Sequence, residues 1–283
     1  LENLRGRDEL SGVSEREYER EGLHIHEAEV TTERAAQLLG KPCGRYLTLS
    51  LEALSRREEE AFPRSVRVLA ALIETLLPPL DSAAPVLIAG LGSRSITPDA
   101  VGPRSADHVI ATRHLISRSP EFFASWRPVS VLAPGVLGQT GVETGEIVRG
   151  VLDHVRPRVV IAIDALAAGR LSRLVRTVQL SDTGIVPGSG VNNARAALDR
   201  QTLGVPVLSI GVPTVADGGS LAHEIAQQLD GAQCEALDDL SQPFIITTRD
   251  IDREVADTAR LIGYAVNMAL QHISIEEIDL YLS

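Results

Sequence analysis

The sequence has few cysteines, few aromatic residues and no long apolar run. Only Cys43 and Cys234 are cysteines, and neither belongs to a Cys-x-x-Cys or cysteine–histidine motif. This excludes a disulfide-rich scaffold and disfavours a zinc-ribbon site, so we expect two reduced thiols, as in a cytoplasmic protein. Because aromatics make up 3 % of the chain, the core must consist of Leu, Val, Ile and Ala. We find no signal peptide and no apolar run of about 18 residues, so nothing predicts export or membrane spanning.

Basic residues are also scarce relative to acidic ones. The chain has 27 Lys and Arg against 38 Asp and Glu, which gives a net charge of −11. A broad nucleic-acid-binding face needs clustered Lys and Arg, so no direct contact with nucleic acid is expected. An acidic chain can still act on a protein that itself sits on DNA. The hydrophobic content of 44 % and the charged content of 23 % are ordinary for a soluble globular protein.

The first part of the chain predicts a charged arm followed by strands and helices. Residues 1–22 are dense in charge and low in apolar content, which favours a mobile or surface-lying arm. "LHIHEAEV" alternates as a half-buried strand does, "TTERAAQLLG" is typical of a short capped helix ending at Gly40, and "GRYLTLSL" predicts another strand. Apolar residues at helical spacing predict a helix over 57–77, before the Pro78-Pro79 stop.

From residue 85 the pattern predicts a parallel sheet. Four short apolar runs, each ending in Gly, Pro or Asp, alternate with helical segments: "PVLIAGLG", "VSVLAPG", "RVVIAIDA" and "VPVLSIGVP". Such alternation indicates an α/β fold with a mostly parallel central sheet flanked by helices. A last amphipathic helix is predicted over 250–272. We therefore expect a single domain over 1–283, in which residues 23–80 pack on an α/β core that spans 85–273.

Two aspartates follow predicted strands of this core. Asp99 lies in "GLGSRSITPDAVGP", and Asp164 closes the most hydrophobic run, in "AIDALA". Loops that leave the carboxyl ends of parallel strands gather at one edge, where ligands bind. Two carboxylates brought close share one proton and can activate a water. The other interpretation is structural: Asp99 caps the helix that follows, and Asp164 caps a helix or binds a loop amide.

Other motifs give weak support to other activities. In "GLGSRS", Ser95 replaces the third Gly of a dinucleotide fingerprint, and the ribose-binding acid is missing. In "VPGSGV", Pro187 stands where a nucleophile elbow around Ser189 needs Gly. The long loop "SDTGIVPGSGVNNAR" over 181–195 is either a plain surface loop or a wall of a cleft that offers amides to a peptide backbone.

The histidines form no evident metal site. His24 and His26 fall on one face of an alternating strand, which is most often solvated. His108 and His114 stand six residues apart on a predicted helix and do not share a face. No HExxH or other zinc ligand set is present.

Seven blocks of the sequence resemble the motif set of the germination protease family, in the family's order and near its spacing. They are "GKPCGRYLTL", "TPDAVGP", "TRHL", "PGVLGQTGVET", "IAIDALAA", "SDTGIVPGSGVNN" and "TLGVPVLSIGVPTVAD". The match runs from about Gly22 to the C-terminus. A run of seven such blocks is far more specific than any short motif.

The resemblance implies an atypical aspartic endopeptidase that starts the degradation of small acid-soluble spore proteins during germination, in the forespore or spore core. It implies that Asp99 and Asp164 are the catalytic pair, with no cofactor and no metal. The implied fold is similar to that of the hydrogenase maturation proteases, a phosphorylase/hydrolase-like fold. Family members are made as inactive precursors, remove a short N-terminal segment themselves, and assemble as homotetramers. The expected partners are the spore proteins as substrates and other copies of the chain.

The chain departs from the family pattern in two places. The stretch between "SLAHEIAQQLDG" and "FIITTRDI" is much shorter than the family's insertion, which bears on assembly contacts or a cleft rim. No propeptide is evident before Leu1, so the sequence is expected to begin at a processed or truncated position. Neither departure touches the two aspartate blocks.

Two alternatives remain beside the aspartic endopeptidase. One is a metal-dependent maturation-type protease on the same fold, in which Asp99 and Asp164 bind the metal with a third ligand from His108, His114 or His154. The other is a non-catalytic protein that holds spore proteins in the same groove. Metal analysis and mutation of either Asp separate the three.

Overall fold

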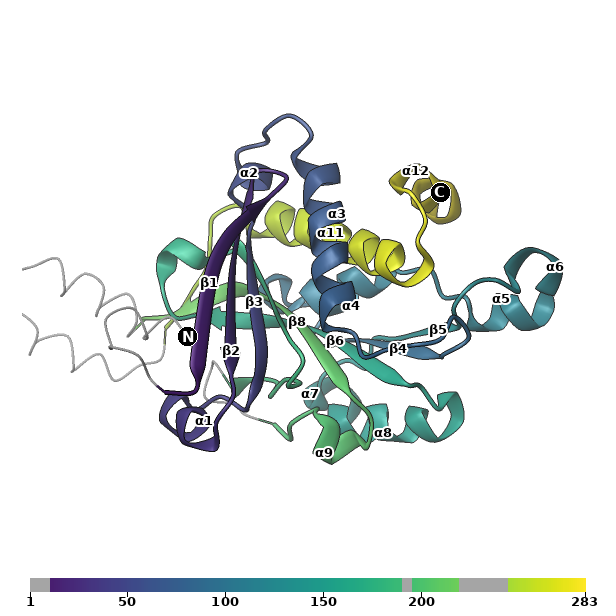
Figure 1. Cartoon of the computed structure of the whole chain (residues 1–283), viewed down its shortest axis with the longest axis horizontal. Coiled ribbons are helices and arrows are strands. Elements are labelled where there is room, and N and C mark those ends of the chain that lie inside the picture. The colour runs from purple at the N-terminus through teal and green to yellow at the C-terminus, as the bar shows by residue number, and fades with distance from the viewer. Residues whose placement is uncertain (1–10, 190–194, 219–243) are drawn as a thin grey trace, which may run out of the picture.

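The computed structural model describes residues 11–189, 195–218 and 244–283. In these residues the strands form one mixed sheet in the order β1-β2-β3-β7-β8-β6-β4-β5, and β9 pairs with β8 (Figure 1). The four predicted apolar runs form its parallel half. They are β4 (Val86–Gly90), β5 (Val129–Leu132), β6 (Val159–Ala168) and β8 (Val207–Asp217). The predicted α/β fold is confirmed, and its parallel part carries the candidate site.

The other half of the sheet is antiparallel. It consists of β1 (Val13–Arg20), β2 (Leu23–Val30), β3 (Gly44–Ser50) and β7 (Thr177–Ser181), and the short β9 (Ile245–Ile246) pairs antiparallel with the far end of β8. The sheet is therefore mixed, and less parallel than the sequence predicted. The alternating pattern of β2 and β3 has a physical reason: only one face of these strands is buried, as in most antiparallel sheets.

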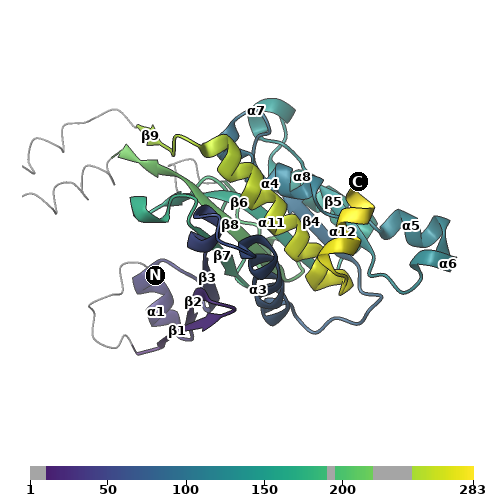
Figure 2. The same cartoon turned by 90° about the horizontal axis from the view of Figure 1, so that it is seen from above.

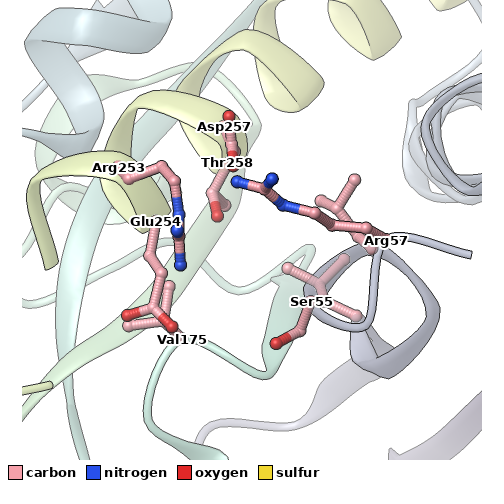
Figure 3. A pocket seen from close by; sticks show the side chains of 9 residues that line it. Ser55, Arg57, Val175, Arg253, Glu254, Asp257 and Thr258 are labelled. Carbon is pink, nitrogen blue, oxygen red and sulfur yellow. The ribbon is translucent and has the colours of Figure 1, made fainter. Parts of the chain in front are cut away.

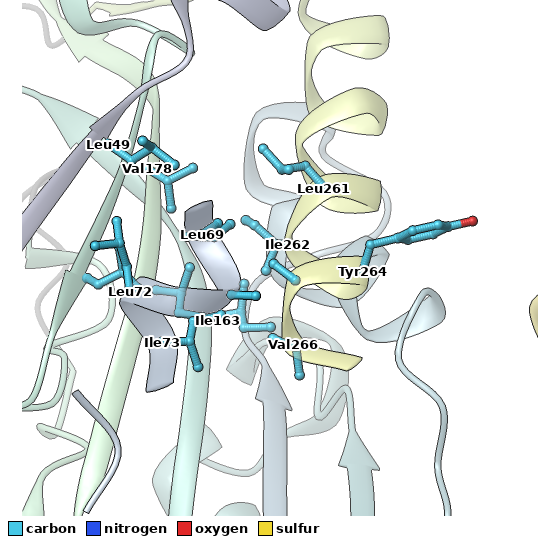
Figure 4. Packing of buried hydrophobic residues seen from close by; sticks show 14 of the residues in the cluster. Leu49, Leu69, Leu72, Ile73, Ile163, Val178, Leu261, Ile262, Tyr264 and Val266 are labelled. Carbon is cyan, nitrogen blue, oxygen red and sulfur yellow. The ribbon is translucent and has the colours of Figure 1, made fainter. Parts of the chain in front are cut away.

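Helices cover both faces of the parallel half (Figure 2). On one face lie α3 (Ala61–Leu76), α4 (Val101–Asp107) and α11 (Ile251–Gln271), which share a core with β4 and β6. Figure 4 shows this core, where Leu69 and Ile73 of α3 and Ile262 of α11 meet around Ile163. On the other face, α8 (Thr144–Val155) and α9 (Arg200–Leu203) pack on the opposite side chains of the same strands.

The predicted charged arm is partly wrong. Residues 13–20 form β1, an edge strand that pairs along its whole length with β2. The turn between them consists of Glu21 (φ 50°) and Gly22 (φ 71°), the two positive φ values that a tight type I′ hairpin requires. Charged residues of β1 form ion pairs with residues of β2: for example, Arg16 Nη2 lies 2.6 Å from Oε2 of Glu27. Residues 1–10 lie outside the described residues.

Several predicted helices are confirmed with small shifts at their ends. The helix α1 (Glu33–Leu39) is capped by Thr32 and ends at the left-handed Gly40, and α11 matches the predicted last helix. The helix predicted over 57–77 begins only at Ala61, after the short α2 (Glu52–Ser55).

Shorter elements complete the described chain, and in it no helix has the length and apolar character needed to cross a membrane. The remaining helices are α5 (Arg113–Arg118), α6 (Pro120–Phe123), α7 (Leu137–Thr140), α12 (Ile275–Leu282) and the 3₁₀ turns η2 (Thr97–Asp99) and η3 (Leu171–Arg173).

Candidate active site at the carboxyl edge of the sheet

Asp164 lies on β6 directly after the position where β4 stops. Gly90, the last residue of β4, pairs with Ile163, whereas Asp164 pairs only with Gly211 of β8 on the other side. The side chain is buried, with 5 % of its surface exposed. The sequence placed Asp164 at the tip of its strand, but β6 continues to Ala168. Asp164 therefore closes the parallel core without ending the strand.

Asp99 reaches the same edge from the loop that follows β4. It ends the 3₁₀ turn η2, and its Oδ2 accepts a hydrogen bond of 2.8 Å from the backbone N–H of Ser93. Gly92 makes this fold of the loop possible: its φ is 105°, and an added Cβ would lie 2.1 Å from the carbonyl oxygen of Asp99. Asp99 makes no cap for α4, whose N-cap residue is Ala100.

A close approach of α4 to the strands fixes the position of η2. A Cβ on Gly102 would lie 2.2 Å from the carbonyl oxygen of Leu91 and 2.4 Å from that of Ile163. On the strand side, a Cβ on Gly90 would lie 2.3 Å from the carbonyl oxygen of Gly102. The first turn of α4 therefore rests directly on the backbones of β4 and β6, one residue before Asp164.

Burial and the charge of Asp99 both favour the protonated form of Asp164. Burial raises the pKa of Asp164, the charge of Asp99 raises it further, and the N–H of Ala165 opposes this only in part, which brings the pKa to about 7. Burial also raises the pKa of Asp99, against the hydrogen bond from Ser93. Near neutral pH, Asp164 is therefore protonated in part of the molecules.

A cluster of polar side chains supports the loop that carries Asp99. Ser93 Oγ, which is almost fully buried, lies 2.9 Å from Ser95 Oγ. Gln139 of α7 donates from Nε2 to Ser93 Oγ at 2.9 Å and to Ser95 Oγ at 3.3 Å. Sequence reasoning missed Gln139, although it lies in the "PGVLGQTGVET" block that follows β5 and so had to reach this edge.

The last long helix holds the other end of this loop. Thr97 Oγ1 donates to Oδ1 of Asp252 on α11 at 2.7 Å, and Arg104 of α4 contacts the backbone oxygen of Asp252 at 3.5 Å. The turn that ends in Asp99 is thus fixed by α7 on one side and by α11 on the other.

The long loop over 181–195 also contacts the block that contains Gln139. Arg195 Nη1 lies 3.3 Å from Oε1 of Glu143, just before α8. Ile185 pairs with Leu198 in a short bridge, which packs next to Gly145 of α8. Residues 190–194 lie outside the described residues, so the cleft wall that the sequence suggested there stays a prediction.

The described residues contain no group of three or more His, Cys, Asp or Glu side chains that could hold a metal ion. His108 is half-buried against the ring of Tyr264, with 6.3 Å between ring centroids. His154 lies in the last turn of α8. The metal-dependent alternative therefore has no third ligand in the part of the chain that the structure describes.

Two hollows lie away from the aspartates. The first, of about 30 Å³, is shown in Figure 3 and is lined by Arg57, Arg253 and Glu254 among others, near the start of α11. The second, of about 250 Å³, lies over β1, β2 and β3 and is lined by polar side chains including His24 and His26. Neither of these two hollows is lined by Asp99 or Asp164.

Comparisons with known proteins place this chain in a family. The family described as germination protease matches residues 2–231. A germination protease of Caldanaerobacter subterraneus subsp. tengcongensis is 40 % identical over 290 residues, covering 93 % of this chain and 89 % of that protein. That of Clostridium tetani is 34 % identical, covering 97 % and 94 %. That of Bacillus subtilis is 45 % identical, covering 76 % of this chain and 59 % of that protein.

Among solved structures, a [NiFe] hydrogenase maturation protease, HycI from Thermococcus kodakarensis, matches 69 % of this chain and 99 % of its own, at 16 % identity and a TM-score of 0.38. A likeness at this TM-score carries no conclusion about mechanism. The sequence relationships are decisive by themselves, because they extend over most of the chain at a third or more identity. With the family pattern covering residues 2–231 and both aspartate blocks within it, the chain belongs to the germination protease family.

Proposed function

We propose that this protein is an aspartate-dependent endopeptidase that cuts small acid-soluble spore proteins during germination. The observation that carries the proposal is the environment of Asp164: burial, and after it the charge of Asp99, raise the pKa of this carboxyl group to about 7. Two neighbouring carboxyl groups, one protonated and one ionised, can act as acid and base on one water. The membership in the germination protease family supports the same class of reaction.

In the proposed reaction, Asp99 is the base and Asp164 the acid. The ionised Asp99 accepts a proton from a water as the water oxygen bonds to the scissile carbonyl carbon, while protonated Asp164 donates to the carbonyl oxygen. The tetrahedral intermediate then collapses as its C–N bond breaks. Asp99 returns its proton to the leaving nitrogen, and Asp164 regains a proton from the hydroxyl that becomes the new carboxyl group. The pair thus ends in its starting protonation state.

The test is cleavage of a purified small acid-soluble spore protein, with the cut mapped by mass. Asp99→Asn and Asp164→Asn should each lower turnover by about 10²–10⁴-fold, because each change removes an acid–base group. Asp107→Asn is the matched control: this carboxylate lies on α4 close to the site, but it binds Arg94 at the surface and should be dispensable. Full activity of the Asp164→Asn variant would contradict the proposal.

A strong chelator and a binding assay address the two alternatives. Activity that survives the chelator supports the metal-free pair, and activity that returns only with added metal supports the metal-dependent protease. A protein that binds the spore protein and never shortens it would be the non-catalytic holder.

We also propose self-association, as the family resemblance implies a tetramer. The surface around α6 and α12 carries exposed apolar side chains: the rings of Trp126 and Tyr281 meet edge to face with their centroids 5.0 Å apart, and Phe122 and Leu280 are more than two-thirds exposed. Large exposed apolar patches often mark contacts between proteins. Light scattering of the purified chain, with Phe122→Ser as the variant, measures the assembly. A monomer at all concentrations would contradict this part of the proposal.

A further inference from the structure

Beyond Asp164, β6 has an edge that no strand of the described chain covers. The last pairing of β4 with β6 joins Gly90 to Ile163, and the N–H of Leu91 donates to the carbonyl oxygen of Ile163 at 2.8 Å. From Asp164 to Ala168, β6 is paired only with β8 in the described residues. The chain after Leu91 turns away into the loop that carries Asp99. In the described residues, β4 therefore does not extend beside Asp164–Ala168.

The backbone groups that face this edge follow from the alternation of the strand. Successive residues of a strand direct their N–H and C=O groups to opposite edges. Ile163 directs its carbonyl to β4, whereas the N–H of Val160 donates to Pro206 at 3.0 Å, just before β8. Ala165 and Ala167 therefore face the open edge, and Asp164 and Leu166 face β8. The register irregularity after Leu166 adds its extra residue on β8, so it leaves the alternation of β6 unchanged.

Most of these edge groups are unpaired. The N–H of Ala165 donates to Oδ1 of Asp164 at 2.9 Å. Among the described residues, the carbonyl of Ala165 and both backbone groups of Ala167 have no hydrogen-bond partner. Ala165, Leu166 and Ala167 are all partly exposed. Natural edge strands are usually protected by Lys, Pro or covering segments. This edge carries the uncharged sequence "ALAA" over residues 165–168.

We propose that this edge of β6 binds the substrate polypeptide as an added strand, which pairs with Ala165 and Ala167 and passes in front of Asp164 and Asp99. The inference rests on the proposed function, because it names how the substrate of that site is held. Strand addition to an open edge is a common way to bind extended peptides: the main chain supplies affinity, and alternate side chains supply selectivity. The occupant is the substrate because the open edge begins at the carboxylate pair. The small side chains of Ala165 and Ala167 let another backbone approach.

Two changes on the enzyme test the contact. Ala167→Pro replaces the N–H that faces the open edge with a ring carbon, and Pro is tolerated on a strand at such a position because no ladder bond to β8 is lost. We expect kcat/KM to fall about 5- to 10-fold, mainly through KM, as the loss of one net hydrogen bond predicts. Ala167→Ser keeps the N–H and is the matched control, expected to stay within about twofold of the wild type. Circular dichroism and thermal melting verify that both variants fold.

A substrate-side series works even if Ala167→Pro fails to fold. Synthetic peptides spanning the mapped cut, or successive segments of the spore protein if no cut is found, carry one N-methyl group at a time. Their affinity is measured with Asp164→Asn, so that binding is read without cleavage. A paired strand predicts losses at every second residue, because only alternate amides face β6. Losses without this period, or none, overturn the strand-addition proposal. Cleavage of the unmodified peptide by the wild type is scored separately, so failure of the proposed function is distinguished from failure of this binding mode.

Discussion

The carboxyl group of Asp164 has a pKa of about 7 because of its burial and its neighbour Asp99. Burial raises the pKa, and the negative charge of Asp99 raises it further. A folded-state pKa above the ordinary value of 3.8 means that the folded protein holds a proton that the unfolded chain has released. The cost of this arrangement is absent below pH 4, grows as the pH rises, and is complete above about pH 7.

The first prediction concerns stability. Asp164→Asn should stabilise the fold at pH 8, by up to about 4 kcal/mol, because it removes the cost of ionising a buried carboxyl group. The gain should become small near pH 3, where Asp164 is mostly protonated in both states. Urea unfolding at both pH values measures it. Asp107→Asn is a control of opposite sign, because Arg94 lowers the pKa of Asp107, and this variant should show no gain at pH 8. Equal effects of Asp164→Asn at both pH values would refute the assignment.

The second prediction concerns the pH dependence of cleavage. If Asp164 is the acid, kcat/KM should decline as the pH rises through about 7, since the required proton is then lost. In Asp99→Asn the neighbouring charge is gone, and the pKa of Asp164 should fall. Carboxyl chemical shifts from NMR follow that pKa without the need for activity. An unchanged titration of Asp164 in this variant would show that the two groups are not coupled.

The third prediction concerns Gln139 as a positioning residue. Gln139→Leu removes the donor that ties Ser93 to Ser95, and the loop that orients Asp99 should loosen. We expect kcat to fall about tenfold with little change in KM, as for a misplaced catalytic group. Thr140→Val is the control from the same helix, because its hydroxyl bonds only to backbone groups of Val136 and Val142. Identical kinetics of the two variants would contradict the proposal that Gln139 positions Asp99.

The fourth prediction concerns the packing of α4. Gly102→Ala would place a methyl group 2.2–2.4 Å from two strand carbonyl oxygens, so the helix must shift. Both stability and activity should drop, with stability lower by about 2 kcal/mol or more. Gly150→Ala on α8 meets nothing within 4 Å and should instead stabilise the protein by about 0.5–1 kcal/mol. Thermal melting of the two variants gives the comparison, and a stable Gly102→Ala protein would contradict the close contact.

The fifth prediction concerns control of the protease. The family resemblance implies a longer, inactive precursor that shortens itself, most readily under mildly acidic conditions, where the pair retains its shared proton. The full-length precursor should lose mass faster at mildly acidic than at neutral pH. The Asp164→Asn precursor should stay intact in the same assay. Shortening of that variant at the wild-type rate would exclude self-processing by these two residues.

The parallel core and its two aspartates could be predicted from the sequence because their signals are local. The continuous apolar runs of β4, β6 and β8 need burial on both faces, and a carboxylate after such a run is conspicuous. The capping of α1 by Thr32 and Gly40 was equally readable.

Contacts between distant segments could not be predicted in the same way. Nothing near Gln139 in the sequence indicates that its amide bonds to Ser93, and nothing near Thr97 indicates Asp252. The charge density of residues 13–20 predicts an arm, and it gives no sign that these residues form β1. The pairing of β1 depends on Glu27 and the other residues of β2. The sequence likewise does not show that β4 ends several residues before β6 does. This difference depends on how the two strands pair, and neither segment alone contains that information.

The link from Thr97 to Asp252 has a consequence for the order in which the protein becomes competent. The chain leaves the ribosome from its N-terminus, so both aspartates emerge long before α11 does. Until α11 has emerged and docked, the turn that ends in Asp99 lacks one of its two anchors. We therefore expect a nascent chain that stops before Asp252 to hold both carboxylates but to lack this second anchor of the turn that ends in Asp99, so that the proposed site is complete only after α11 has been made.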